Sequence, residues 1–261
     1  MMSRRCVRFI VLAVVCAIAS PWAEVARAHG VTLKIHHALP VDSVFHTQFL
    51  LPWKEKLEQE SNGYLRIQVF PAMVANENPL PLYDQVKDRT ADIVWTSVGN
   101  DAWRFPGVEV FNLPLSTNTA KGSNRALWAY IQANNLARRE FSGVRLLAVH
   151  VSPAPTPTAA SSPFSDIFVL VMNAETYRGL SDELKKVINA NSGADMSATL
   201  GRIFDDNKAR AGQSAGGERS DAVAQQIAID NRIKELDQRG LDGKELVESA
   251  RALLTQYDRP H

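Results

Sequence analysis

The chain has 261 residues with 29 basic and 28 acidic side chains, so its formal net charge at pH 7 is only +1. A balance so close to neutral excludes the classes of protein that bind nucleic acid or anionic membrane surfaces through a basic field. The two cysteines, Cys6 and Cys16, both lie near the N-terminus. If that segment is removed, no thiol remains for a disulfide, a nucleophile or a metal ligand.

The first 28 residues have the pattern of a secretory signal peptide. Three arginines among the first eight residues precede an apolar run at 9–19, and Ala26-Arg27-Ala28 has the A-x-A form of a cleavage site. This run is too short to span a bilayer, which takes about 20 residues. The sequence therefore predicts export to the periplasm, with no membrane insertion after cleavage. Arg4-Arg5 leaves a twin-arginine export route open as well.

Residues 31–98 are expected to alternate strands and helices. Apolar and polar residues alternate at 33–36 and 65–69, and the apolar run at 92–96 suits a buried strand. The intervening helices are predicted from the capping residues Asp42 and Ser43 to the turn at Asn62-Gly63, with a kink at Pro52, and at 79–89. This β-α-β-α-β order predicts a parallel sheet with right-handed crossovers.

The second half of the chain is predicted to be mostly helical. Residues 152–166 contain four prolines among Ser, Thr and Ala, which is typical of a loop or linker. The remaining elements are predicted as a helix at 120–141, strands at 144–149 and 167–172, a helix that begins at Ser181, a break at 212–220, and helices at 221–239 and 242–257.

Several segments recur in the order and spacing of one known family. In the first half they are Leu33–Pro40, Pro52–Lys56, Glu60–Gly63, Val69–Ala72, Tyr83–Val86, Ala91–Trp95, Arg104–Pro106 and Glu109–Pro114. Near the C-terminus they are Val171–Asn173 with Tyr177 and Leu180, Ile188–Gly193 and Gly240–Leu246. On these residues the chain resembles the solute-binding proteins of TRAP (tripartite ATP-independent periplasmic) transporters.

The resemblance implies an α/β fold similar to type II periplasmic binding proteins, with a complete first lobe at 29–151 and a return strand and C-terminal helices at 167–261. A full-length member has a second-lobe segment of several tens of residues between these halves. That segment holds an Arg-x-Pro motif, whose arginine clamps the substrate carboxylate, and an Asp-Gly strand-turn. Neither occurs between His150 and Phe168. Residues 152–166 are therefore interpreted as a junction that replaces much of a truncated second lobe.

The function that the resemblance implies is capture of a small organic acid outside the cytoplasm. The loaded protein docks on TRAP permease subunits after hinge closure, without chemistry or a cofactor. No G-x-S-x-G elbow, P-loop or dinucleotide-binding glycine pattern occurs, so an enzyme is not expected, and no His or carboxylate set has metal-like spacing. Three alternatives stay open: a degenerate copy that has lost ligand binding, an interaction module that docks a membrane partner without solute, and an enzyme whose catalytic residues are scattered along the chain.

Two candidate ligand-binding positions carry a basic or titratable side chain. Arg104 is the nearest cation that can replace the missing arginine, and it follows a predicted strand, where sites of parallel sheets lie. Its alternative role is a structural corner with a solvated guanidinium. His37, beside His36, ends the first strand, a position that the resemblance places toward the ligand; a packed histidine is the other interpretation.

The other candidates are polar or aromatic residues at strand ends. Asn76 follows the second strand, and Ser97 and Asn100 follow the third; all three also suit ordinary turns. Trp95 lies within the third strand, as a cleft wall or a core residue. Asn173 ends the return strand, where the resemblance puts it near the hinge, and it also fits a turn.

Overall fold

The structure, a computed structural model, describes residues 30–71, 81–115, 119–153, 165–212 and 222–257. The predicted signal peptide, Asn76 and most of the predicted 152–166 junction lie outside these ranges. Among the helices within them, none has the length and apolar character needed to cross a membrane.

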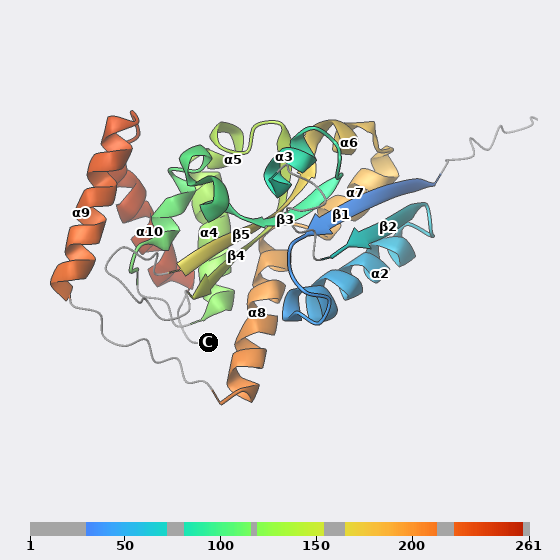
Figure 1. The fold of residues 1–261 in the computed structure, drawn as a ribbon, viewed down its shortest axis with the longest axis horizontal. Helices are drawn as coiled ribbons and strands as arrows, with labels where there is room; N and C mark the ends of the chain where they lie inside the picture. The colour runs from blue at the N-terminus through green and yellow to red at the C-terminus, as the bar shows by residue number, and fades with distance from the viewer. Residues whose placement is uncertain (1–29, 72–80, 116–118, 154–164, 213–221, 258–261) are drawn as a thin grey trace, which may run out of the picture.

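A five-stranded sheet forms the centre of the fold, in the order β2-β1-β3-β5-β4 (Figure 1). Its strands are β1 Val31–His37, β2 Leu65–Phe70, β3 Ile93–Ser97, β4 Val144–Pro153 and β5 Ser165–Asn173. Strand β1 pairs in parallel with β2 and β3, which confirms the predicted parallel unit. Strand β5 is antiparallel to both β3 and β4, so the complete sheet is mixed.

Helices cover both faces of this sheet (Figure 1). They are η2 Phe45–Leu50, α2 Leu51–Glu60, α3 Leu82–Lys87, η3 Val98–Arg104, η4 Val108–Asn112, α4 Ala120–Ala133, α5 Leu136–Arg139, α6 Ala174–Gly179, α7 Asp182–Ala190, α8 Ala194–Arg210, α9 Ala222–Gln238 and α10 Gly243–Tyr257. The predicted α/β class and the helical C-terminus are confirmed.

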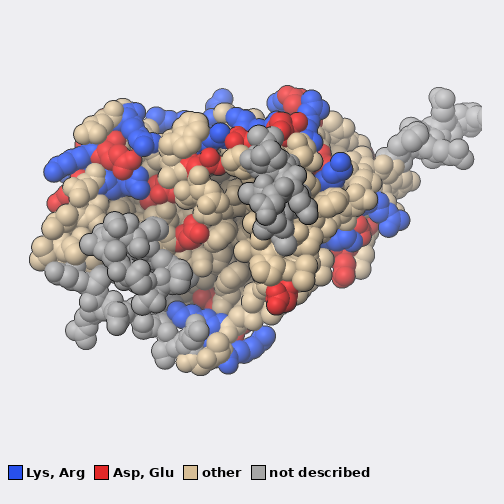
Figure 2. All heavy atoms as spheres, in the orientation of Figure 1, with Lys and Arg blue, Asp and Glu red and all other residues tan. Residues whose placement is uncertain are grey.

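Two hydrophobic cores lie on opposite faces of the sheet. Successive side chains of a strand point to opposite faces, and in β5 Val169 and Val171 belong to one core while Leu170 and Met172 belong to the other. The first core packs against α3, α4, α9 and α10, and the second against α2, α7 and α8. On the face drawn in Figure 2, basic and acidic side chains are interspersed, as a nearly neutral chain predicts.

The expected kink at Pro52 is instead a change of helix type. The π-helix η2 ends at Leu50, and Pro52 occupies the first turn of α2. Proline is tolerated there because the first N–H groups of a helix have no intrahelical partner. The helix then ends, as predicted, at Asn62 and Gly63, both of which have positive φ.

Two predicted boundaries are wrong. The helix predicted at 120–141 is interrupted by Asn135, whose φ of 56° is left-handed, so that α4 and the short α5 are separate. The predicted junction is too wide, because Ser152 pairs with Asp166 and Pro153 with Ser165. Proline at the end of an edge strand removes no hydrogen bond from a sheet interior.

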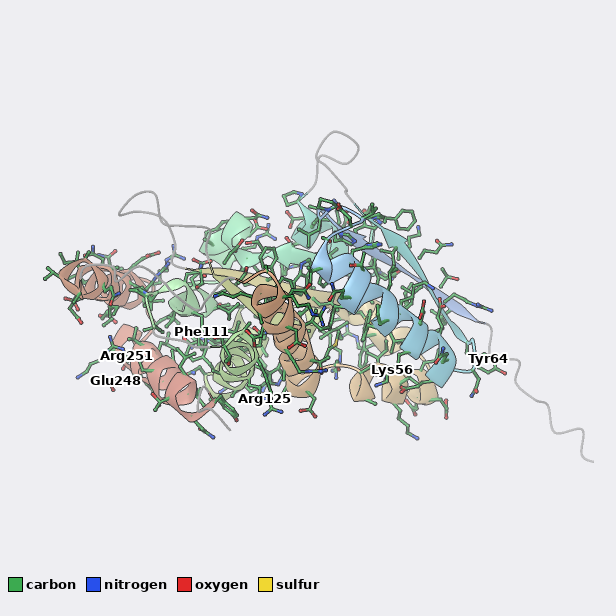
Figure 3. The ribbon with its side chains drawn as sticks, turned by 90° about the horizontal axis from the view of Figure 1, so that it is seen from below. Lys56, Tyr64, Phe111, Arg125, Glu248 and Arg251 are labelled. Atoms are coloured by element: carbon green, nitrogen blue, oxygen red, sulfur yellow. The ribbon has the colours of Figure 1, made fainter. Side chains whose placement is uncertain are left out.

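Helix α4 lies between α8 and α10 (Figure 3). Gly201 makes the close approach of α8 possible, because a Cβ at this position would lie 2.5 Å from the carbonyl oxygen of Ala120. We expect Gly201→Ala to lower the free energy of unfolding by about 1–3 kcal/mol through overpacking. The matched control is Gly179→Ala, since a Cβ added at Gly179 would have no other atom within 4 Å. Equal urea midpoints for the two variants would contradict this account.

Candidate functional site

The carboxyl ends of the parallel strands bring together residues from four strands. His37 of β1 pairs with Trp95 of β3, Ser97 of β3 pairs with Phe168 of β5, and Phe168 pairs in turn with His150 of β4. Sites of open α/β sheets lie at this end. We call Phe45, His46 and Phe204, together with His37, Trp95, His150 and Phe168, the strand-end cluster.

Three aromatic rings of the cluster are stacked nearly parallel. Trp95 lies between Phe45, at a centroid distance of 4.1 Å, and Phe168, at 5.5 Å, with interplanar angles of 14° and 8°. Trp95 is only 2% exposed, and its indole Nε1 has no hydrogen-bond partner among the described residues. The predicted cleft wall is therefore a buried ring that keeps an unused N–H donor.

His37 forms a buried pair with His46, in which His37 Nε2 and His46 Nδ1 are 2.9 Å apart. Burial, followed by the neighbouring His46, lowers the pKa of His37 to about 4. A hydrogen bond between two imidazole nitrogens needs one donor and one acceptor, which a neutral His37 can provide in either tautomer. His37 therefore brings a neutral, hydrogen-bonding ring to the cluster.

His150 has a tautomer that its neighbours determine. Asn124 accepts from the backbone N–H of Val151 at 2.8 Å, so its amide NH₂ faces the Nδ1 of His150 at 3.1 Å and donates to it. The proton of a neutral His150 must then sit on Nε2, which is buried and has no partner among the described residues. Burial lowers the pKa of His150 to about 3. Trp95 and His150 thus supply two unused N–H donors to one cluster.

Three of the predicted ligand-binding residues have other surroundings. Ser97 Oγ lies 2.5 Å from Asp166 and also caps η3 by accepting from the N–H of Gly99. Asn100 is exposed within η3. Asn173 is buried at the start of α6, where its carbonyl caps the helix and its amide donates to the backbone oxygen of Val86. The fold gives Ser97 and Asn173 structural roles, while their ligand-binding roles stay predictions.

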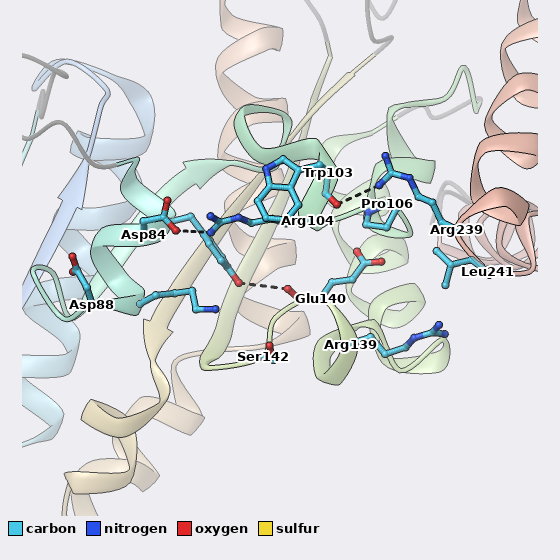
Figure 4. A pocket seen from close by; sticks show the side chains of 12 residues that line it. Asp84, Asp88, Trp103, Arg104, Pro106, Arg139, Glu140, Ser142, Arg239 and Leu241 are labelled. Atoms are coloured by element: carbon cyan, nitrogen blue, oxygen red, sulfur yellow. Dashed lines mark hydrogen bonds and ion pairs between the residues drawn. The ribbon is translucent and has the colours of Figure 1, made fainter.

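Arg104 lies in a separate pocket of about 890 Å³, formed by α3, η3, α5 and the segment between α9 and α10 (Figure 4). Its guanidinium forms an ion pair with Asp84 at 2.5 Å and lies over the exposed ring of Trp103. The hydrogen bond to Asp84 raises the pKa of Arg104. This cation is therefore already paired, and its contacts are not with the strand-end cluster.

Glu140 lines the same pocket as a largely buried carboxyl group (Figure 4). Burial raises its pKa to about 7, although the backbone N–H groups of Gly107 and Val108 donate to it at 2.7 and 3.1 Å. These two hydrogen bonds hold the beginning of η4 against the end of α5, which gives Glu140 a structural role. Its raised pKa also means that its protonation state changes near neutral pH.

No candidate role was predicted from the sequence for His46, His150, Phe168 or Phe204. His150 and Phe168 lie on either side of the Pro-rich segment, and only the antiparallel pairing of β4 and β5 makes them neighbours. A detectable signal existed for His150, because it continues the strand predicted at 144–149 toward the carboxyl end.

Residues 35–159 match the family model described as "Bacterial extracellular solute-binding protein, family 7". The "Outer membrane transporter protein TsaT" of Comamonas testosteroni is 27% identical over 128 residues, which are 49% of this chain but only 37% of TsaT. The match therefore spans well under two thirds of that curated relative.

Solved structures match most of the chain. A TRAP solute-binding protein from Rhodoferax ferrireducens T118, in complex with copurified benzoate, is 25% identical with a TM-score of 0.74, over 87% of this chain and 98% of that one. A marine metagenome TRAP solute-binding protein specific for aromatic acid ligands, with 3-hydroxybenzoate, is 25% identical with a TM-score of 0.75, over 88% and 99%. Residues 35–159 thus match the bacterial extracellular solute-binding proteins of family 7, and the chain has the fold of a TRAP solute-binding protein.

Proposed function

We propose that this protein captures a small organic acid in the periplasm and delivers it to the membrane permease subunits of a TRAP-type transporter. The family model that matches residues 35–159 describes extracellular solute-binding proteins, and this match supports a role in transport. The predicted signal peptide supports export. Ligand capture by closure around a bound solute needs binding groups only, and no reaction is assigned to the chain.

The observation that carries the proposal is the pair of unused donors in the strand-end cluster. The indole N–H of Trp95 and the Nε2–H of His150 are buried without partners among the described residues. A buried donor without an acceptor costs about 1–3 kcal/mol, so a ligand that brings an acceptor recovers this free energy. A carboxylate offers two acceptor oxygens, which suits two donors.

The aromatic walls of the cluster favour an aromatic acid as the ligand. Phe45 and Phe168 stack on Trp95, and the ring of an aromatic acid can extend this stack on the other face of Phe168. The structures from Rhodoferax ferrireducens and the marine metagenome contain benzoate and 3-hydroxybenzoate. By this likeness we infer that benzoate-like acids are the ligand class. Access needs movement of Phe168 or Phe204, which are both half-buried.

The proposal makes a prediction about ligand-dependent stability. We expect benzoate, but not the neutral benzamide, to raise the melting temperature as its concentration passes Kd, because only the folded state binds it. His150→Phe, which keeps a ring and removes a donor, should reduce the shift. Arg104→Gln should leave it unchanged if the strand-end cluster is the site. A shift that disappears in Arg104→Gln instead would move the ligand to the pocket in Figure 4.

One observation favours the second candidate function, docking of a membrane partner without solute. Strands β4 and β5 pair as far as Pro153 and Ser165, so only residues 154–164 connect them. The family resemblance implies a second-lobe segment of several tens of residues here. Pull-down of the permease subunits with and without benzoate separates the two functions. Retention that does not depend on benzoate, with no thermal shift for any acid, would favour the docking function.

A further inference from the structure

A second pocket, of about 400 Å³, lies at the edge of the sheet beside the beginning of β4. Its walls include Trp128 of α4, Val144 and Leu146 of β4, and Tyr177 of α6. The volume lies within the range of about 300–1,000 Å³ that small-molecule sites occupy. The beginning and end of β4 are far apart, because strands rise about 3.3 Å per residue, so this pocket is separate from the strand-end cluster.

Arg145 is the polar group that this pocket holds in a fixed position. Its Nη2 donates to Asn189 Oδ1 at 2.7 Å, and its guanidinium lies over the ring of Tyr177, 4.2 Å from the centroid. The hydroxyl of Tyr177 donates to the same Asn189 oxygen at 2.8 Å. Stacking and a shared acceptor therefore orient the guanidinium before any ligand arrives, which lowers the entropy cost of binding.

The charge of Arg145 is not neutralised by the described part of the protein. Its partners, Asn189 and Tyr177, carry no charge, and its Nε is buried without a hydrogen-bond partner among the described residues. Arg178, the other cation at the pocket, is paired with Glu175. Among the described residues that line the pocket, none is acidic. The pocket thus combines one oriented, unpaired guanidinium with apolar and aromatic walls.

We propose that this pocket binds a small carboxylate with an apolar or aromatic body, at a site distinct from the strand-end cluster. Arg145 supplies a charge-assisted hydrogen bond to the carboxylate. Trp128 and Tyr177 enclose the body of the ligand, as aromatic side chains do in pockets with few polar groups. The site does not depend on the solute-binding function proposed above, because it shares no residue with the cluster that carries that function.

The test is a benzoate titration of the exported chain, followed by the indole N–H signals in ¹H–¹⁵N NMR spectra. Of the five tryptophans in the full sequence, Trp22 lies in the predicted signal peptide, so each of the four remaining signals can be assigned from a Trp→Phe variant. We expect the Trp128 signal to shift and saturate with benzoate and not with benzamide. Arg145→Gln should weaken this binding about tenfold or more, since it removes a charge-assisted bond.

The matched control is Arg66→Gln, which removes an exposed arginine from β2 at the opposite edge of the sheet and should leave the titration unchanged. Arg145→Lys keeps a cation without the planar fork and should bind with intermediate affinity. An unchanged Kd in Arg145→Gln, or an equal response to benzamide, would overturn the proposal. The Trp95 signal reports separately on the strand-end cluster, so failure of one site is distinguishable from failure of the other.

Discussion

Replacing Trp95 with alanine is expected to lower the free energy of unfolding by about 3–5 kcal/mol, as large-to-small changes of buried tryptophans do. Trp95 is 2% exposed and its ring lies between Phe45 and Phe168. Truncation removes both stacking contacts and leaves a cavity that the two remaining rings, fixed on η2 and β5, can fill only in part. Urea unfolding followed by circular dichroism measures the change.

Trp103 is the matched control for this substitution, because it is 67% exposed. Trp103→Ala loses only the stacking on Arg104, and we expect a cost of about 0.5–1 kcal/mol. Trp95→Phe keeps a ring in the stack and should cost less than Trp95→Ala. Equal losses for Trp95→Ala and Trp103→Ala would show that the stack does not stabilise the fold.

Much of the first half of the fold could be predicted, because its signals are local. Alternation at 33–36 and 65–69 and the apolar run at 92–96 became β1, β2 and β3. Each of these strands buries apolar residues, and the helical segments between them fit the parallel crossovers. The α/β class followed from this order of elements alone.

The mixed character of the sheet could not be predicted, because it depends on pairings between distant segments. The insertion of β5 between β3 and β4 is a property of the tertiary structure, and no local pattern specifies it. The same pairing also extends β4 to Pro153, although prolines are typical of loops. Local composition therefore gave a linker that is longer than the real gap between the strands.

The candidate site likewise has residues that local signals predict and residues that only long-range packing brings together. His37 and Trp95 were recognised because strand ends are where ligands bind, and both belong to the strand-end cluster. Arg104 followed the same rule but pairs with Asp84, a residue of α3 that no spacing rule connects to it. His150 was missed because its partners, Asn124 and Phe204, come from α4 and α8. Long-range packing thus selects which strand-end residues meet.

Three buried titratable groups should make the stability of the protein depend on pH. The pKa of His37 is lowered to about 4 and that of His150 to about 3, so below an unfolded-state pKa of about 6.5 the unfolded chain binds two protons that the folded chain does not. Stability therefore falls as the pH falls. Glu140, with a pKa raised to about 7, acts in the opposite direction, because down to about pH 4.5 the folded chain holds a proton that the unfolded chain lacks.

For these three groups together, the unfolded chain binds one proton more than the folded chain. We therefore expect the free energy of unfolding to fall by about 3 kcal/mol between pH 6.5 and 4, at roughly 1.4 kcal/mol per proton and pH unit. His150→Gln removes one titrating imidazole and should make the fall shallower by about 3 kcal/mol, the share of that histidine. Glu140→Gln removes the opposing group and should make the fall steeper. Urea unfolding at four pH values in this range measures all three slopes. Parallel curves for the wild type and His150→Gln would mean that His150 can be protonated in the folded state, and that its ring is not enclosed as Asn124 and Phe204 indicate.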